Sequence, residues 1–162
     1  MAVPSGTQGG VMISNVLFLC LGFIAAVLCI DLRFDVACWR HRRDPKGVPA
    51  EILEPAVRYY RTITRAPQPL STVILAALAC VALETVYQLV PRSFGYPALA
   101  LFGLASLVGI LKVIPTAQQL ASTNEAAEQR RIVFSLLPYH VAMLASVLLL
   151  AGTHVAAVSD MR

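Results

Sequence analysis

Four long stretches of apolar residues, almost free of charge, dominate this 162-residue chain. A helix needs about 20 mostly apolar residues to cross the hydrocarbon core of a bilayer. Helices are the expected form of such spans, because backbone polar groups in lipid must be satisfied within their own segment. We therefore expect an all-α integral membrane protein, a four-transmembrane-helix bundle in which residues 1–162 form a single membrane domain. The spans are expected at approximately 11–31, 70–90, 97–114 and 132–153.

The composition excludes several other classes of protein. Apolar residues make up 57% of the chain and charged residues 14%, whereas a soluble domain carries about 25% charged residues. A soluble globule of this length cannot bury so many apolar side chains, which argues against a soluble enzyme, a nucleic-acid-binding domain and a disordered linker. The flank before the first span has no Lys or Arg, unlike a signal peptide or a mitochondrial presequence, so we expect the first span to remain in the mature protein.

The positive charges are distributed unevenly between the two sides of the predicted bundle. Of the 13 Lys and Arg residues, all but Arg92 and Arg162 lie between spans one and two or around the connection between spans three and four. Positive charge marks the cytoplasmic or matrix face of a membrane protein. We therefore expect both termini on the non-cytoplasmic side of a bacterial plasma membrane or an organelle inner membrane. The bilayer accounts for the net charge of +4, and no nucleic-acid partner is expected.

The inner loop, residues 32–69, contains a predicted amphipathic helix over approximately 54–65. Val57 and Tyr60 share one face of this segment, and its arginines share another, a pattern typical of a helix lying at the membrane interface. Aromatic residues at this level, Tyr59 and Tyr60 among them, are expected to form an interfacial belt. A cluster of basic residues next to the first span is expected to attract anionic lipid head groups; it consists of Arg40, Arg42 and Arg43.

Glu84 is the most prominent charged residue within a predicted span. With Cys80 and Gln88 it forms a polar stripe at spacings of four residues, and such a stripe is expected to face other helices. His154 belongs near the same outer level and is a candidate partner. Two interpretations compete. In one, Glu84 is protonated and hydrogen-bonds to a neighbouring helix; in the other, it is a proton or cation site.

A second polar group lies at the inner end of span one. Asp31 and Asp35 are four residues apart, so both point to the same side of a helix. One interpretation pairs Asp31 with Lys112, which enters the same layer from span three. A metal ion bound by the two aspartates and His140 is a further hypothesis, but such a ligand mixture has no established spacing, and no metal site is assigned.

Common catalytic and cofactor motifs are absent from the sequence. It contains no HExxH, P-loop, GxSxG or CxxCH pattern, each of which would indicate a specific chemistry. His140 and His154 are separated by roughly 21 Å along one helix, so they cannot ligate one haem from opposite faces. No cofactor is predicted.

The sequence leaves three functions open. The first is an accessory or structural subunit of a larger membrane complex, with other membrane subunits as partners and no catalytic role. The second is a small membrane enzyme or a lipid- or quinone-binding protein. It would use Asp31, Asp35, Tyr139 and His140, with a carboxylate and an imidazole dividing the base and acid roles. The third is a transporter or a proton path through Glu84.

Overall fold

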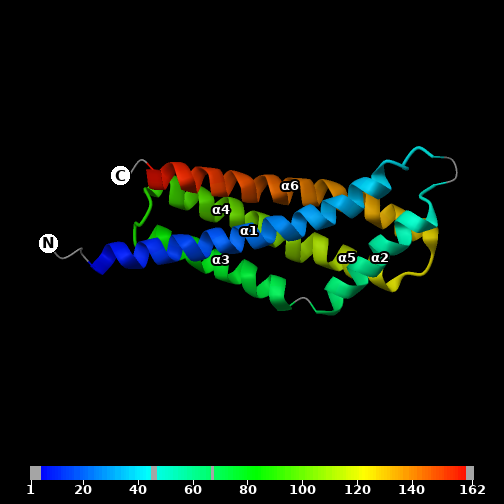
Figure 1. Cartoon of the computed structure of the whole chain (residues 1–162), viewed down its shortest axis with the longest axis horizontal. Coiled ribbons are helices and arrows are strands. Elements are labelled where there is room, and N and C mark those ends of the chain that lie inside the picture. Colours follow the sequence, from blue (N-terminus) through cyan, green and yellow to red (C-terminus); the bar gives the residue numbers. More distant parts are fainter. Residues whose placement is uncertain (1–4, 45–46, 67, 160–162) are drawn as a thin grey trace.

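The computed structural model describes residues 5–44, 47–66 and 68–159. Every regular element within these ranges is helical (Figure 1), which confirms the expected fold class. The elements are α1 (Ser5–Trp39), α2 (Ala50–Arg65), α3 (Gln68–Val86), α4 (Arg92–Val108), η1 (Gly109–Val113), α5 (Ile114–Ser122) and α6 (Ala126–Ser159).

Four helical runs are long and apolar enough to cross a membrane, which is the make-up of a multi-pass membrane protein. They are α1, α3, the unbroken run of α4, η1 and α5, and α6. In Figure 1, these helices run along the long axis of the molecule, and α1 begins at the same end at which α6 ends. The other end holds α2 and α5. The prediction of a four-helix bundle with a short helix between spans one and two is confirmed.

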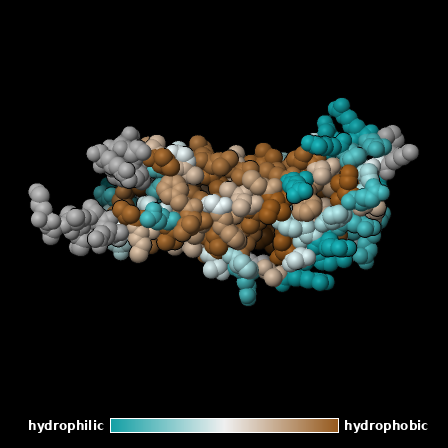
Figure 2. Space-filling model, in the orientation of Figure 1, coloured by the Kyte–Doolittle hydropathy of each residue, from teal (hydrophilic) through white to brown (hydrophobic). Residues whose placement is uncertain are grey.

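Several of these helices are longer than the apolar stretches that predict them. The first continues to Trp39, and the third run extends from Arg92 to Ser122. Figure 2 shows that apolar residues cover the middle of the visible face, whereas hydrophilic residues gather at the α2–α5 end. The membrane helices therefore extend past their apolar sections, and the last turns of α1 and α5 and the first turns of α6 contribute to a polar, basic end of the bundle.

The amphipathic helix α2 begins earlier than predicted, at Ala50 instead of near residue 54. Pro49 directly precedes it, and Pro55, next to the expected start of the helix, lies inside it. A proline in this position removes one intrahelical hydrogen bond. Burial of Leu53 and Val57 offsets that loss, because these side chains pack into an apolar cluster with α5 and α6.

The packing of α2 on the bundle is also polar. The guanidinium Nε of Arg61 donates a hydrogen bond to the carbonyl oxygen of Ala121, 3.1 Å away, in the last turn of α5. The last carbonyls of a helix lack partners within the helix and attract positive charge. This contact therefore fixes α2 against the end of the third membrane helix.

Two apolar clusters lie in the interior of the bundle. Along helix α1, buried polar residues lie between the residues that belong to the two clusters. The first cluster joins α2, α5 and the adjacent ends of α1 and α6; the second joins α1, α3, α4 and α6 in the middle of the bundle. On α1, Leu28 belongs to the second cluster and Cys38 to the first. Asp31 and Asp35 are the buried polar residues between them.

The short element η1 is a turn of π-helix inside the third membrane helix. Gly109, its first residue, lies close to α6, because a Cβ atom at this position would lie 3.3 Å from Cε of Met143. π-helical turns are rare and frequently occur at functional sites. Here the π-helical turn forms part of the wall of the cavity described below.

Candidate functional site

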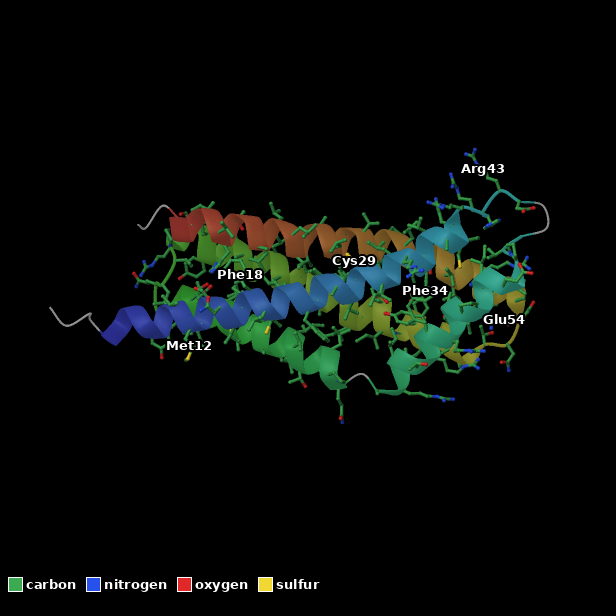
Figure 3. The ribbon with its side chains drawn as sticks, viewed as in Figure 1. Met12, Phe18, Cys29, Phe34, Arg43 and Glu54 are labelled. Atoms are coloured by element: carbon green, nitrogen blue, oxygen red, sulfur yellow. The ribbon has the colours of Figure 1, made fainter. Side chains whose placement is uncertain are left out.

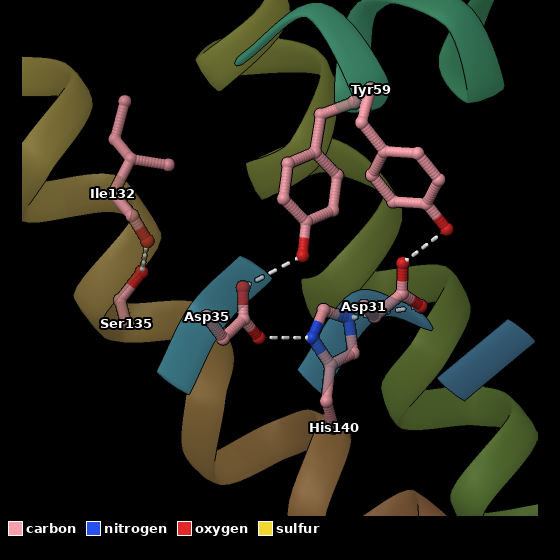
Figure 4. A network of polar contacts seen from close by, with 7 residues as sticks. Asp31, Asp35, Tyr59, Ile132, Ser135 and His140 are labelled. Atoms are coloured by element: carbon pink, nitrogen blue, oxygen red, sulfur yellow. Dashed lines mark hydrogen bonds and ion pairs between the residues drawn. The ribbon is translucent and has the colours of Figure 1, made fainter. Parts of the chain in front are cut away.

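Five polar side chains from three helices meet inside the bundle, toward its α2–α5 end. Helix α1 supplies Asp31 and Asp35, whose spacing of one turn places both on the same side. Helix α2 supplies the neighbouring residues Tyr59 and Tyr60, and α6 supplies His140 (Figure 4). We refer to these five residues as the inner polar cluster.

His140 and Asp35 form the most tightly bonded pair in the cluster. Nδ1 of His140 lies 2.6 Å from Oδ2 of Asp35, and the Tyr60 hydroxyl donates to Oδ1 of the same carboxylate at 2.8 Å. All three residues are only 1% exposed, and the rings of Tyr60 and His140 are nearly parallel, at 8°. A carboxylate on one ring nitrogen orients an imidazole and favours a hydrogen on that nitrogen. Asp35 and Tyr60 thus hold the ring so that Nε2 faces the other way.

Asp31 lies on the other side of the same imidazole. Its Oδ1 accepts a hydrogen bond of 2.8 Å from the Tyr59 hydroxyl, and its Oδ2 lies 3.9 Å from Nε2 of His140. That separation is too long for a hydrogen bond. His140 is therefore bonded to one carboxylate and faces a second one across a gap (Figure 4).

The two tyrosines remain hydrogen-bond donors over the whole neutral range. Burial, together with the adjacent carboxylates, raises the pKa of the Tyr59 phenol above its ordinary value. The same causes raise the pKa of the Tyr60 phenol. A phenolate next to a carboxylate in a region of low dielectric is unfavourable because both groups are negatively charged.

An apolar cavity adjoins the inner polar cluster on the membrane side. Most of its wall consists of apolar side chains such as Ile24, Phe102 and Val147. The polar side chains in the wall are Asp31, His140 and Ser106. Asp35 does not line it, so the cavity meets the cluster on the Nε2 side of His140.

The wall of this cavity has a gap between two helices. Leu70 and Ile74 of α3 line one side, and Ile110 and Ile114 of the third membrane helix line the other. In the described part of the chain, α3 contacts α1 and α4 but not η1 or α5. The cavity thus opens sideways, where the apolar side chains of Ile110 and Ile114 are exposed.

The cluster is not arranged as a metal site. Across the residues that the structure describes, no group of three or more His, Cys, Asp or Glu side chains could hold a metal ion. The hypothesis of an ion bound by Asp31, Asp35 and His140 fails on geometry, because the imidazole lies between the two carboxylates. Its two nitrogens face different aspartates, so no single position is close to all three side chains.

Glu84 lies in a second buried polar cluster near the other end of the bundle. The Ser14 hydroxyl donates to Oε1 of Glu84 at 2.7 Å, and Nε2 of His154 lies 3.4 Å from the same oxygen. Phe18 meets the edge of the His154 ring. The structure therefore brings Glu84 and His154 together, as the sequence suggested. Gln88 is not part of this group, because α3 ends at Val86 and Gln88 is exposed in the following turn.

Other candidates lie apart from the inner polar cluster. Lys112 is exposed on η1, and the structure does not pair it with Asp31, whose bonded partner is Tyr59. Tyr139 is half-buried next to His140 in the chain, but none of the contacts found for the five clustered residues involves it.

The basic residues proposed to meet lipid head groups are all exposed at the α2–α5 end. The guanidinium of Arg42 lies 4.7 Å from the centre of the Trp39 ring, a cation–π contact. In Figure 3, Arg43 extends away from the bundle, whereas Phe34 on α1 lies on the side of α2, where it stacks on Tyr59. The exposed arginines are Arg40, Arg42 and Arg43.

Tyr59, Tyr60 and Ser14 are functional candidates that the sequence did not reveal. The two tyrosines were expected in an aromatic belt facing the membrane interface, and instead they turn into the bundle. The apolar face of α2 was a signal that Tyr60 is buried, but nothing in the sequence indicated which carboxylate it meets.

No known protein family, curated protein or solved structure matches this chain.

Proposed function

We propose that this membrane protein binds a lipophilic molecule inside its helix bundle and that His140 exchanges a proton with the polar end of that molecule. The observation that carries the proposal is the apolar cavity whose polar wall residues include Asp31 and His140. Most ligand sites have this form, with apolar walls and a few polar groups that fix the orientation. Of the functions left open by the sequence, the lipid- or quinone-binding alternative is the one that this geometry favours.

The gap between Asp31 and His140 suits an oxygen atom of the ligand. The facing atoms, Oδ2 and Nε2, are 3.9 Å apart, so one oxygen can lie about 2.8 Å from both, an ordinary hydrogen-bond length. A hydroxyl group can donate to the carboxylate while it accepts from Nε2 of the protonated imidazole, or donate to Nε2 of the neutral imidazole. This selects a molecule with an apolar body and a hydroxyl end, such as a quinol or a sterol, because a carbonyl oxygen has no hydrogen to donate to the carboxylate.

The sideways opening supports entry of the ligand from the membrane. A lipophilic molecule is concentrated in the bilayer, and the gap between α3 and the third membrane helix is lined by Leu70, Ile74, Ile110 and Ile114. Because these four side chains are apolar, no polar side chain of the protein has to leave water when the molecule enters by this route. Once inside, the molecule meets its first buried charged or titratable groups at Asp31 and His140.

The pair of Asp35 and His140 supports acid–base chemistry on the ligand. An imidazole that is oriented by a carboxylate can accept a proton on Nε2 and return it, and a positioned group of this kind accelerates proton transfer by about 10²–10⁴-fold. Asp31, on the far side of the gap, stabilises the positive charge that the imidazole gains. These roles need no metal ion.

The experiment that tests the proposal is native mass spectrometry of the protein purified in mild detergent. We expect a bound lipophilic molecule on the wild-type protein and its loss from Ala105→Phe, because Ala105 lines the cavity. Ala100→Phe on the same helix is the control, since Ala100 is exposed and does not line the cavity. Equal occupancy in the two variants, or an empty wild-type protein, would contradict the proposal.

We also propose that the α2–α5 end faces the cytoplasm or matrix, because the basic residues gather there. The starting protein is a variant without cysteines. Glu54→Cys and Arg92→Cys, both exposed and at opposite ends of the bundle, are then labelled in intact cells with a maleimide that cannot cross membranes. We expect labelling at position 92 and protection at position 54; the reverse pattern would invert the orientation.

Two further functions stay predictions. The subunit role is tested by the mass of the particle extracted in mild detergent, which would reach hundreds of kilodaltons with defined companion chains. The proton or transport path through Glu84 is tested by Glu84→Gln, which should abolish transport and leave the bundle folded.

A further inference from the structure

Tyr59 and Tyr60 are adjacent in the chain but differ in their surroundings. Tyr60 is 1% exposed, and its hydroxyl bonds to Asp35. Tyr59 is half-buried, and besides bonding to Asp31 it lines a hollow on the outer surface of α2. This surface hollow is lined by Glu54, Pro55, Arg58, Tyr59 and Thr62.

Tyr59 therefore separates two spaces of different character. The surface hollow lies at the polar end of the molecule, among the charged side chains of Glu54 and Arg58. The cavity on the other side of Asp31 is almost wholly apolar. The hydrogen bond from Tyr59 to Asp31 is the polar contact between these two spaces that the structure shows.

We infer that Tyr59 carries protons between water in the surface hollow and the Asp31–His140 gap, and so supplies the proton exchange proposed for His140. This inference rests on the proposed function, and it names the source of the proton. In each step, the Tyr59 hydroxyl gives its proton to Oδ1 of Asp31 while its oxygen takes a proton from water. The carboxylic acid group of Asp31 then rotates, so that the same proton faces the gap. Because Oδ2 and Nε2 lie 3.9 Å apart, too far for direct transfer, a water molecule in the gap takes this proton and gives one of its own to Nε2 of His140. The reverse sequence releases a proton.

The side chains around Tyr59 and Asp31 make the path through Tyr59 the favoured one for a proton that moves between water and His140. The titratable or charged groups that face it are Asp31 and Asp35 on α1, Glu54, Arg58 and Tyr60 on α2, and His140 on α6. Tyr60 and Asp35 are each only 1% exposed, so they have almost no surface from which to take a proton. On the membrane side, Ser106 is the one additional polar side chain in the wall of the cavity, so the cavity offers no chain of polar groups leading to water.

The test measures how fast the hydrogen on Nε2 of His140, which the ring carries in its protonated form, exchanges with water. The full-length protein is labelled with ¹⁵N at histidine and studied by NMR in lipid nanodiscs, without added ligand. The sequence has three histidines, so the His41→Gln and His154→Gln variants assign the His140 signal. We expect Tyr59→Phe to slow the exchange by about 10²-fold, the scale of a positioned proton-transfer group.

Tyr60→Phe is the matched control, because it removes the equivalent hydroxyl from the next residue. It should shift the His140 ring signals, since it removes a bond from Asp35, and slow the exchange much less than Tyr59→Phe does, because Tyr60 is only 1% exposed and does not reach the surface hollow. A folded Tyr59→Phe protein whose His140 exchanges as fast as the wild type would overturn the inference. Equal slowing in both variants would also overturn it, because that result indicates a general loss of packing.

A second variant covers the case in which Tyr59→Phe does not fold. Thr62→Trp fills the surface hollow from an exposed position and leaves the Tyr59–Asp31 bond in place. It should slow the exchange as well, and unchanged exchange would count against the inference. Neither measurement uses a ligand, so the proton route can fail while the cavity still binds its molecule, and the cavity can prove empty while the route holds.

Discussion

Replacing Asp35 by alanine should destabilise the bundle much more than replacing Asp31 by alanine. The two residues are one turn apart on the same helix, and each accepts a hydrogen bond from a tyrosine of α2. Only Asp35 also contacts His140 at hydrogen-bond distance. The pair therefore offers a matched comparison within a single cluster.

The expected magnitude follows from the groups that lose their acceptor. Asp35→Ala leaves the Tyr60 hydroxyl and Nδ1 of His140 without an acceptor, and both residues are 1% exposed. A buried donor left unsatisfied costs about 1–3 kcal/mol, so the two together cost about 2–6 kcal/mol. Asp31→Ala removes a bond from the half-buried Tyr59, which can bond to water instead, and should cost about 0.5–1.5 kcal/mol.

The assay is unfolding by sodium dodecyl sulfate in mixed micelles, followed by circular dichroism. A double-mutant cycle of Asp35→Ala with Tyr60→Phe should give a coupling energy of about 0.5–3 kcal/mol, because the two residues bond to each other. If Asp35→Ala costs no more than Asp31→Ala, or if the cycle shows no coupling, the bonding described for the cluster is refuted.

Two further predictions concern packing and pH. Gly95→Ala should destabilise the protein by about 1–3 kcal/mol, because the new Cβ would lie 2.8 Å from Oγ1 of Thr85. Gly103→Ala has nothing within 4 Å and should stabilise by about 0.5–1 kcal/mol through helix propensity; thermal unfolding of both variants distinguishes the two signs. The raised pKa values of Tyr59 and Tyr60 mean that folding holds both phenols protonated. Their contribution to stability is complete below about pH 10, the ordinary phenol value, and falls as the pH rises above it. Denaturation at increasing pH should therefore show a steeper loss above pH 10 for the wild-type protein than for the Tyr59→Phe/Tyr60→Phe double variant, and parallel curves would contradict the burial of these phenols.

The sequence could predict features that depend on bilayer thickness and helical periodicity. The apolar stretches must be long enough to cross the membrane, and the four helices follow from that requirement. The spacing of Asp31 and Asp35 placed them on one side of α1. The level of His140 could also be predicted, because its distance from the end of its own span can be counted along the helix.

Features that depend on how separate helices dock could not be predicted. An amphipathic pattern shows that one face of α2 is apolar, but it does not say whether that face meets lipid or protein. Tyr59 and Tyr60 consequently looked like residues of an interfacial belt. Their bonds to the two aspartates arise from the packing of α2 on α1 and α5, which no local pattern encodes.

Local irregularities account for the two remaining differences. The stripe expected to include Gln88 assumed a helix through residue 90, whereas the chain at Gln88 adopts a positive φ of 55° after α3 has ended. The pairing of Lys112 with Asp31 assumed a regular third helix. The π-helical turn at Gly109–Val113 changes the phase of the residues around it by up to about 100°, the rotation of one helical residue.

The most direct test of the central claim is an experimental structure of the protein in a lipid nanodisc, obtained with a rigid antibody fragment bound to it. We predict elongated density in the cavity that reaches the opening between α3 and η1, with its polar end between Oδ2 of Asp31 and Nε2 of His140. A structure in which α3 closes onto η1, the cavity is filled by its own side chains and Asp31 bonds directly to His140 would contradict the account.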